Sequence, residues 1–197
     1  MRVKERMTPD PISISPRASV DEALKLMREH GVRHLPVVDG EEVVGLVNDI
    51  ELRTAWFPSL LDELTVKDVM VSDPMTIQAG DTVYQAARLL YQHKLTGLLV
   101  VEDGHLVGII TLADILGIFV ELLGLLGDSC RIDVAIRPGE QNLEQIYSHL
   151  TAQGADIISV ALVSNQPGRR VYSLRLDCAD AGQVCAQLSA AGFEILE

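Results

Sequence analysis

Cysteine is scarce in this sequence, and no pair of cysteines has metal-binding spacing. Three occur, all in the last third of the chain and none in a Cys-x-x-Cys motif: Cys130, Cys178 and Cys185. An odd number of scattered cysteines favours free thiols in a reducing compartment over a disulfide or a metal site. No other cluster of histidine, cysteine and acidic residues has the spacing of metal ligands, so no metal is expected.

Long apolar runs and an excess of basic charge are also absent. The most apolar stretch, Leu112–Leu126, is too short to span a bilayer and contains two acidic residues. The charged start Met1–Arg6 does not have the pattern of a signal peptide. Sixteen lysines and arginines stand against 28 aspartates and glutamates, a net charge of −12, which argues against nucleic acid or an anionic membrane surface as a partner. We therefore expect a cytoplasmic protein without membrane insertion.

Motifs for common enzyme chemistry are missing as well. The sequence has no Walker loop and no Gly-x-Gly-x-x-Gly loop, and it places no base beside a serine or cysteine. With 48% hydrophobic but only 4% aromatic residues, the composition fits an aliphatic α/β core. These features predict a globular protein without catalytic activity.

The strongest positive feature is a duplication. Segment 3–55 aligns with segment 66–118 without a gap, and 15 of the 53 aligned residues are identical. Two copies of one unit predict a pseudo-two-fold axis, with a cleft and two related pockets between the copies. The first copy is expected to occupy residues 1–64 and the second residues 65–127.

Each copy has the pattern β-α-β-β-α. Ser19 and Thr82 have the features of helix N-caps, with Glu22 and Gln85 three residues later as capping-box partners. A proline-containing lead precedes a short first strand, and two further strands form a hairpin around an acidic glycine turn. The two copies are expected to pack sheet to sheet. The strands are predicted at 12–14, 35–38 and 43–47, then at 75–77, 98–101 and 106–110, with second helices at 49–56 and 112–126.

A different pattern begins at Arg131. Its elements follow the order β-α-β-β-α-β, which is the order of a ferredoxin-like sandwich. The predicted fold class is therefore mixed, with α/β repeats followed by an α+β domain at 130–197. The strands of this domain are predicted at 131–136, 157–164, 171–176 and 193–196, and its helices at 143–153 and 181–190.

The repeated unit resembles the cystathionine-beta-synthase (CBS) domain, and residues 1–127 resemble a tandem CBS pair. The likeness rests on the lead Met7-Thr8-x-x-Pro11, the segment His34–Asp39 and the closing segment Gly108–Asp114. Such pairs are regulatory modules that bind an adenosine-containing ligand. The resemblance therefore implies a non-enzymatic sensor that needs no cofactor and takes AMP, ADP, ATP, NAD or S-adenosylmethionine as its regulatory ligand.

Residues 130–197 resemble an ACT domain. The likeness rests on Arg137-Pro138-Gly139 and on Gly154–Ile157, although Leu143 follows Gly139 after a longer loop than is usual in the family. The combination of the two parts resembles the CBS–ACT proteins linked to bacterial acetoin utilisation. In the ACT family the loop with Arg137, Gly139 and Asn142 commonly holds a small ligand, often an amino acid, but the lengthened loop favours an ordinary strand-to-helix turn here.

The CBS resemblance implies one strong pocket. By position, Asp114 would bind the ribose hydroxyls, Thr111 and nearby helix N–H groups would hold a phosphate, and Arg33 and His34 would also meet phosphate. The alternative is that Thr111 and Asp114 only cap a helix, and that Arg33 and His34 face solvent. The implied ligand residues are Thr8, Ser13, Arg33, His34, Leu35, Pro36, Thr111 and Asp114.

The related second pocket is expected to be weaker. Asn48 and Glu51 stand where the first pocket has Thr111 and Asp114, and the strand residues that accompany them bring no positive charge. We therefore expect one good site and one degenerate or empty site. The residues of the second pocket are Val71, Thr76, Thr96, Gly97, Asn48 and Glu51.

The segment Leu112–Leu126 is more apolar than a surface helix needs to be. We interpret it as a homodimer interface, to which the edges of the ACT-like sheet add, rather than as simple core. The regulated partner is expected to be an enzyme or a transporter. Two other functions remain open: a structural dimerisation module with vestigial pockets, and a small-molecule or amino-acid sensor that acts through the ACT-like part.

Overall fold

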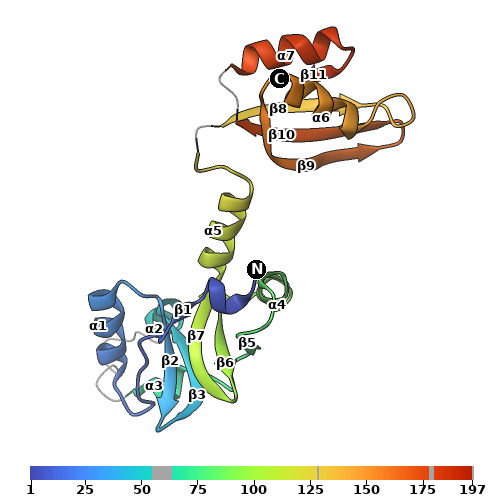
Figure 1. Cartoon of the computed structure of the whole chain (residues 1–197). Coiled ribbons are helices and arrows are strands. Elements are labelled where there is room, and N and C mark those ends of the chain that lie inside the picture. Colours follow the sequence, from blue (N-terminus) through green and yellow to red (C-terminus); the bar gives the residue numbers. More distant parts are fainter. Residues whose placement is uncertain (55–63, 128, 178–179, 197) are drawn as a thin grey trace. The chain divides into compact units, whose positions relative to one another are not determined.

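The computed structural model describes residues 1–54, 64–127, 129–177 and 180–196 (Figure 1). The chain forms two compact units, Met1–Leu116 and Gly117–Glu197, and each is considered by itself. The first unit contains both copies of the repeat, and the second contains the β-α-β-β-α-β segment. No helix in the described ranges is long and apolar enough to cross a membrane.

The first copy follows the predicted order, with two additions at its start. A short 3-10 helix, η1, and a two-residue strand, β1, precede the first α-helix, while the predicted strand at 12–14 is reduced to one bridge between Ile14 and Val37. The remaining elements match the prediction, except that the end of the predicted helix 49–56 lies outside the described residues. The bounds are η1 Val3–Glu5, β1 Thr8–Pro9, α1 Val20–His30, β2 His34–Asp39, β3 Glu42–Asn48 and α2 Asp49–Thr54.

The second copy has a similar order, but a short α-helix, α3, replaces η1, and a strand, β5, forms where the first copy has a single bridge. The predicted helix 112–126 is shorter than expected and ends at Leu122. Its helix α4 begins after Thr82, whose hydroxyl accepts a hydrogen bond from Gln85 N while Gln85 Oε1 accepts one from Thr82 N (3.2 and 2.8 Å). Ser19 and Glu22 cap α1 in the same way, so both predicted capping boxes are confirmed. The bounds are α3 Val66–Val69, β4 Val71–Ser72, β5 Thr76–Gln78, α4 Val83–His93, β6 Gly97–Glu102, β7 His105–Thr111 and α5 Leu112–Leu122.

The lead strands are exchanged between the copies. Strand β1 of the first copy pairs with β7 of the second, and β4 of the second copy pairs with β3 of the first. The unit therefore has one sheet ordered β1-β7-β6-β5 and one ordered β2-β3-β4, and each sheet contains a strand from the other copy (Figure 1). The sequence analysis did not predict this exchange.

The residues before each lead strand dock in the same reciprocal way. Val3 N donates to Asp81 O (2.8 Å), and the equivalent Val66 N donates to Ala18 O (2.8 Å). Both valine side chains are fully buried, so burial of apolar surface accompanies the hydrogen bonds. Each copy thus covers part of the other copy's core.

Glycine at two equivalent positions permits this exchange. A Cβ at Gly108 of β7 would overlap Met7 and lie 3.0 Å from Thr8 O, and a Cβ at Gly45 of β3 would overlap Met70 and lie 3.2 Å from Val71 O. Only a residue without a side chain lets the exchanged strand approach this closely. The pairs Met7–Gly108 and Met70–Gly45 therefore mark the two places where a lead strand pairs with the other copy.

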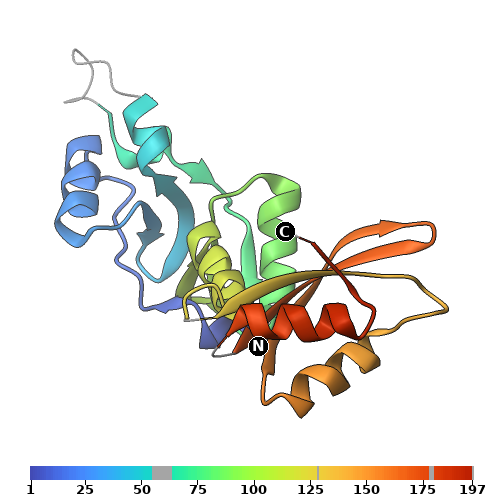
Figure 2. The same cartoon turned by 90° about the horizontal axis from the view of Figure 1, so that it is seen from above.

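The second unit has the element order that the sequence predicts. Its four strands form one antiparallel sheet in the order β11-β8-β10-β9, and α6 and α7 lie on the same face of it (Figures 1 and 2). Ile146 and Leu150 of α6 share a core with Val184 and Leu188 of α7. The bounds are β8 Cys130–Ile136, α6 Leu143–Ala152, β9 Asp156–Gln166, β10 Arg169–Asp177, α7 Ala181–Ala190 and β11 Glu194–Leu196.

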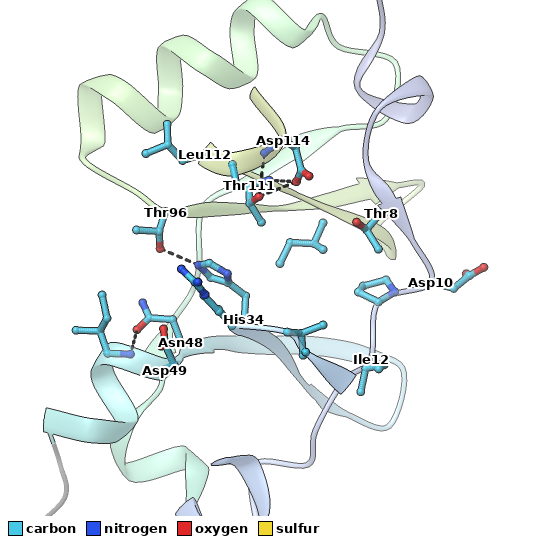
Figure 3. Close-up of a pocket in the computed structure, with 17 residues that line it drawn as sticks. Thr8, Asp10, Ile12, His34, Asn48, Asp49, Thr96, Thr111, Leu112 and Asp114 are labelled. Atoms are coloured by element: carbon cyan, nitrogen blue, oxygen red, sulfur yellow. Dashed lines mark hydrogen bonds between the residues drawn. The ribbon is translucent and has the colours of Figure 1, made fainter. Parts of the chain in front are cut away.

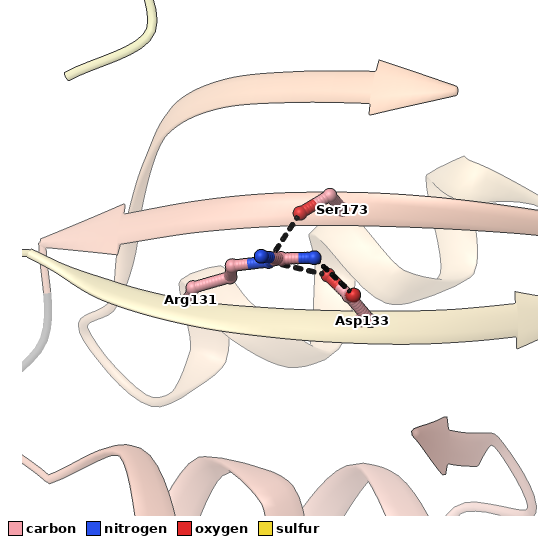
Figure 4. A network of polar contacts seen from close by, with 3 residues as sticks. All are labelled: Arg131, Asp133 and Ser173. Atoms are coloured by element: carbon pink, nitrogen blue, oxygen red, sulfur yellow. Dashed lines mark hydrogen bonds and ion pairs between the residues drawn. The ribbon is translucent and has the colours of Figure 1, made fainter. Parts of the chain in front are cut away.

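A polar network joins two central strands of this sheet, β8 and β10 (Figure 4). Arg131 of β8 donates to both carboxylate oxygens of Asp133 (3.0 and 2.6 Å) and to the hydroxyl of Ser173 on β10 (3.0 Å). The hydrogen bonds from Arg131 lower the pKa of Asp133. Because Arg131 is already held by these partners, we assign this network a structural role.

The cysteine prediction is wrong at one position. Cys130 is disulfide-bonded, whereas Cys185 is a free thiol. Sequence spacing did not reveal this bond, because the pairing of cysteines depends on which segments the fold brings together.

Candidate functional site

A cavity of about 710 Å³ lies between the two copies in the first unit (Figure 3). Its walls come from the first lead segment, the start of β2, and the two segments in which β3 meets α2 and β7 meets α5. The pseudo-two-fold therefore produces a cleft, as the duplication predicts. The lining residues are Thr8, Asp10, Pro11, Ile12, Gly31, Val32, Arg33, His34, Asn48, Asp49, Ile50, Thr96, Ile109, Thr111, Leu112, Ala113 and Asp114.

Thr111 and Asp114 form the start of α5 and are hydrogen-bonded to each other. Asp114 Oδ2 accepts from Thr111 N (2.8 Å) and from Thr111 Oγ1 (2.7 Å), and Asp114 N donates to Thr111 Oγ1 (3.3 Å). This is a capping arrangement that fixes both side chains at the cavity wall. The cap and a ligand-binding role are thus compatible, since both residues also line the cavity.

Asn48 and Glu51 form the equivalent start of α2. Asn48 Oδ1 accepts from Ile50 N (3.0 Å) and Glu51 N (2.9 Å), and Glu51 Oε2 accepts from Asn48 N (3.2 Å). Glu51 does not line the cavity, and its partial burial raises the pKa of its carboxyl. Asn48 therefore lines the cavity, as its equivalent Thr111 does. Glu51 does not line the cavity, whereas its equivalent Asp114 does.

His34 connects the two copies. Its Nε2 lies 2.8 Å from Thr96 Oγ1, and its ring packs beside Gly97, where an added Cβ would lie 3.3 Å from the imidazole. Burial lowers the pKa of His34; Asp49 and Asp114 oppose this shift, whereas Arg33 reinforces it. His34 therefore bridges the two copies as a mostly neutral imidazole.

This environment predicts a loss of stability in mild acid that depends on His34. The unfolded chain binds a proton near the ordinary histidine pKa of 6.5, but the folded chain binds it only at lower pH. The stability is therefore complete above pH 6.5 and falls as the pH decreases toward the lowered pKa. Urea unfolding at pH 7.5, 6.5 and 5.5 should show a steeper loss in the native protein than in His34→Gln. The variant His30→Gln, at an exposed position, should keep the native slope; equal slopes in all three proteins would contradict the prediction.

The structure brings together part of each predicted pocket. Thr8, Arg33, His34, Thr111 and Asp114 of the first set line the cavity, and so do Asn48 and Thr96 of the second set. The cavity thus draws on both sets. The predicted residues that do not line it are Ser13, Leu35, Pro36, Val71, Thr76, Gly97 and Glu51.

Local packing explains two of these exclusions. The Leu35 side chain is fully buried in the core of the first copy, and Pro36 O already accepts a hydrogen bond from Ile14 N (2.9 Å). Asp10 and Asp49 also line the cavity but were not predicted from the sequence. Asp10 lies in the lead segment and Asp49 begins α2, and these two places in the repeat could have indicated them.

A smaller cavity of about 280 Å³ lies in the second unit, at the loop before α6. Gly139 and Asn142 line it, as do Arg170 and Tyr172 of β10, whereas Arg137 does not. Asn142 caps α6 by accepting from Gln145 N (2.9 Å). Within the described ranges, no group of three or more histidine, cysteine or acidic residues is placed to hold a metal ion.

Comparison with known proteins places the likeness in the first unit. An inosine-5'-monophosphate dehydrogenase of Korarchaeum cryptofilum is 41% identical over 107 residues, which are 54% of this chain but 22% of that enzyme. The chain spans about a fifth of the first two curated relatives. The likeness to these enzymes is thus confined to part of their length.

Two solved structures have the same fold over this region. CBSX2 of Arabidopsis thaliana, solved in complex with AMP, is 33% identical with a TM-score of 0.54, and the match covers 61% of this chain and 96% of that one. The CBS domain pair of protein MJ0100, in complex with 5'-methylthioadenosine and S-adenosyl-L-methionine, is 27% identical with a TM-score of 0.56, and covers 60% and 95%. The CBS domain model matches residues 3–57 and 66–121, so this chain belongs to the CBS domain family.

Proposed function

We propose that this protein is a non-catalytic sensor that binds an adenosine-containing ligand in the cavity between its two CBS copies. The observation that carries the proposal is the cavity itself, in which Thr111 and Asp114 of one copy face Thr8 and Arg33 of the other. A carboxylate such as that of Asp114 can accept hydrogen bonds from two vicinal hydroxyls, which is the chemistry that ribose requires. The AMP and S-adenosylmethionine complexes of related CBS pairs support this choice.

Isothermal titration calorimetry tests the proposal. The full chain is titrated with AMP, ADP, ATP, NAD, S-adenosylmethionine and 5'-methylthioadenosine. Binding of at least one of them is expected with a Kd in the micromolar range, about −8 kcal/mol. Absence of heat with every ligand, together with an unchanged melting temperature, would leave the structural dimerisation module as the better description.

We also propose that the protein acts as a homodimer through α5 and the residues that follow it. Leu116, Phe119, Leu122 and Leu126 are 63%, 46%, 55% and 79% exposed, whereas Ile118 of the same helix is buried. A second copy of this chain offers an apolar surface of the same kind, which makes the contact self-complementary. Sedimentation equilibrium should give the mass of a dimer, and a monomer at all concentrations would refute this proposal. The regulated partner, an enzyme or a transporter, and the cytoplasmic location remain expectations.

The second unit supplies a second candidate function. Its element order and antiparallel sheet fit the proposed ferredoxin-like, ACT-type domain, and the small cavity at Gly139 and Asn142 lies where that family holds an amino acid. Arg170 lines this cavity and offers a cation to a carboxylate. A rise in melting temperature with amino acids, and none with adenosine ligands, would favour this function over the first.

A further inference from the structure

The helix start of α5 offers few free N–H groups to the cavity. The N–H groups of Thr111 and Asp114 donate to each other's side chains, and Leu112 N donates to Thr96 O (3.0 Å). A helix N-terminus binds phosphate through N–H groups that have no protein acceptor. The first turn of α5 is therefore poorly suited to hold a chain of phosphates.

The start of α2 is closed in the same way. Ile50 N and Glu51 N donate to Asn48 Oδ1, and Asn48 N donates to Glu51 Oε2. Asp49 N donates to Arg33 O (3.1 Å). Most first-turn N–H groups that border the cavity thus have protein acceptors, and no acceptor is assigned to Ala113 N of α5.

The side-chain charges of the cavity point in the same direction. Among the described lining residues, Arg33 carries the positive charge, and Asp10, Asp49 and Asp114 carry negative charges. The Asp10 carboxylate points away from the cavity (Figure 3), so Arg33 against Asp49 and Asp114 gives a formal charge of −1 when His34 is neutral. Burial lowers the pKa of His34, which favours its neutral form at pH 7. An anionic substituent on the ligand meets net repulsion in such a cavity.

The remaining lining is suited to uncharged groups. Five branched aliphatic side chains border the cavity together with the hydroxyls of Thr8 and Thr96. Thioether and methyl groups gain from contact with such surfaces, because apolar area leaves water without an unpaired polar atom. The aliphatic residues are Ile12, Val32, Ile50, Ile109 and Leu112.

We propose that the cavity selects adenosine ligands whose 5' substituent is neutral or cationic, the thioether and sulfonium nucleosides, over adenosine polyphosphates. This inference rests on the proposed sensor function and adds the ligand class. Affinity decreases with each phosphate added to the 5' position, because the helix starts offer few N–H donors to phosphate and the aspartates repel it.

Calorimetry with matched ligands tests the selectivity. The full chain is titrated at pH 7.5 in the presence of EDTA with 5'-methylthioadenosine, S-adenosylmethionine, AMP and ATP. The first two are expected to bind about tenfold more tightly than ATP, with AMP in between. Equal or tighter binding of ATP overturns the selectivity and leaves the sensor function standing. Absence of binding by all four ligands removes the selectivity, and absence of binding by ADP and NAD as well removes the sensor function.

A charge variant gives a second readout. Asp49→Asn removes one negative charge at the cavity and is expected to tighten ATP binding about fivefold, while 5'-methylthioadenosine changes less than about twofold. Asp21→Asn is the matched control, because Asp21 is also a first-turn acid, on α1, and does not line the cavity. If Asp49→Asn leaves ATP binding unchanged, or alters both ligands equally, the electrostatic basis of the proposal is wrong.

Discussion

Replacing Asp114 by alanine is expected to weaken binding of the adenosine ligand about a hundredfold, since the lost charge-assisted hydrogen bonds contribute about 3 kcal/mol. The carboxylate stands at the cavity wall, fixed there by Thr111 N and Oγ1 at 2.8 and 2.7 Å. Alanine removes both the acceptor for ribose and the cap of α5. Calorimetry with the ligand that binds the native protein most tightly measures the loss.

The second copy of the repeat provides the control for this variant. Glu51 occupies the position equivalent to Asp114 and caps α2 through Asn48 N, but it does not line the cavity. Glu51→Ala is therefore expected to lose a comparable cap, about 1 kcal/mol of stability, and to keep the ligand affinity within about twofold. Equal loss of affinity in the two variants would show that capping, and not ligand contact, explains Asp114.

Replacing Gly108 by alanine is expected to cost about 2 kcal/mol of stability and to weaken the ligand about tenfold. The new methyl group would overlap Met7 and press on Thr8 O. Since β1 is a strand of two residues that pairs directly with β7, a small shift moves Thr8 away from the cavity. Urea unfolding and calorimetry measure the two effects on the same sample.

The equivalent variant Gly45→Ala separates stability from binding. It crowds Met70 and Val71 O in the same manner, but neither residue lines the cavity. We expect a similar loss of stability and ligand affinity within about twofold. Gly80→Ala, where an added Cβ meets open space, should change neither quantity appreciably. Ligand binding that weakens equally in the Gly45 and Gly108 variants would contradict a role of β1 in the site.

The elements that the sequence predicted well are those determined by nearby residues. The capping boxes of Ser19 and Thr82 and the hairpins between β2 and β3 and between β6 and β7 depend on contacts a few residues apart. The exchange of β1 and β4 escaped prediction because each strand has only two residues. A segment this short has no periodicity, and its partner lies far away in the chain.

The site was predictable by position but not by geometry. The duplication and the CBS resemblance pointed to Thr111 and Asp114, and both line the cavity. The contact between His34 and Thr96, 62 residues apart, joins residues that the sequence assigned to different pockets. Such a contact follows from how the two copies meet across the pseudo-two-fold, which the linear sequence does not specify.

The exchanged lead strands also constrain how this protein is made. When the ribosome has released the whole first copy, strand β1 at Thr8–Pro9 still has no partner, because β7 at His105–Thr111 has not been synthesised. The first copy also lacks Val66 and strand β4 at this stage, because both belong to the second copy. The nascent first copy therefore remains an open intermediate with uncovered apolar surface, of the kind that chaperones bind. The sheet β2-β3-β4 can close once Ser72 has been synthesised, whereas the sheet β1-β7-β6-β5 closes only after Thr111, near the end of synthesis of the first unit.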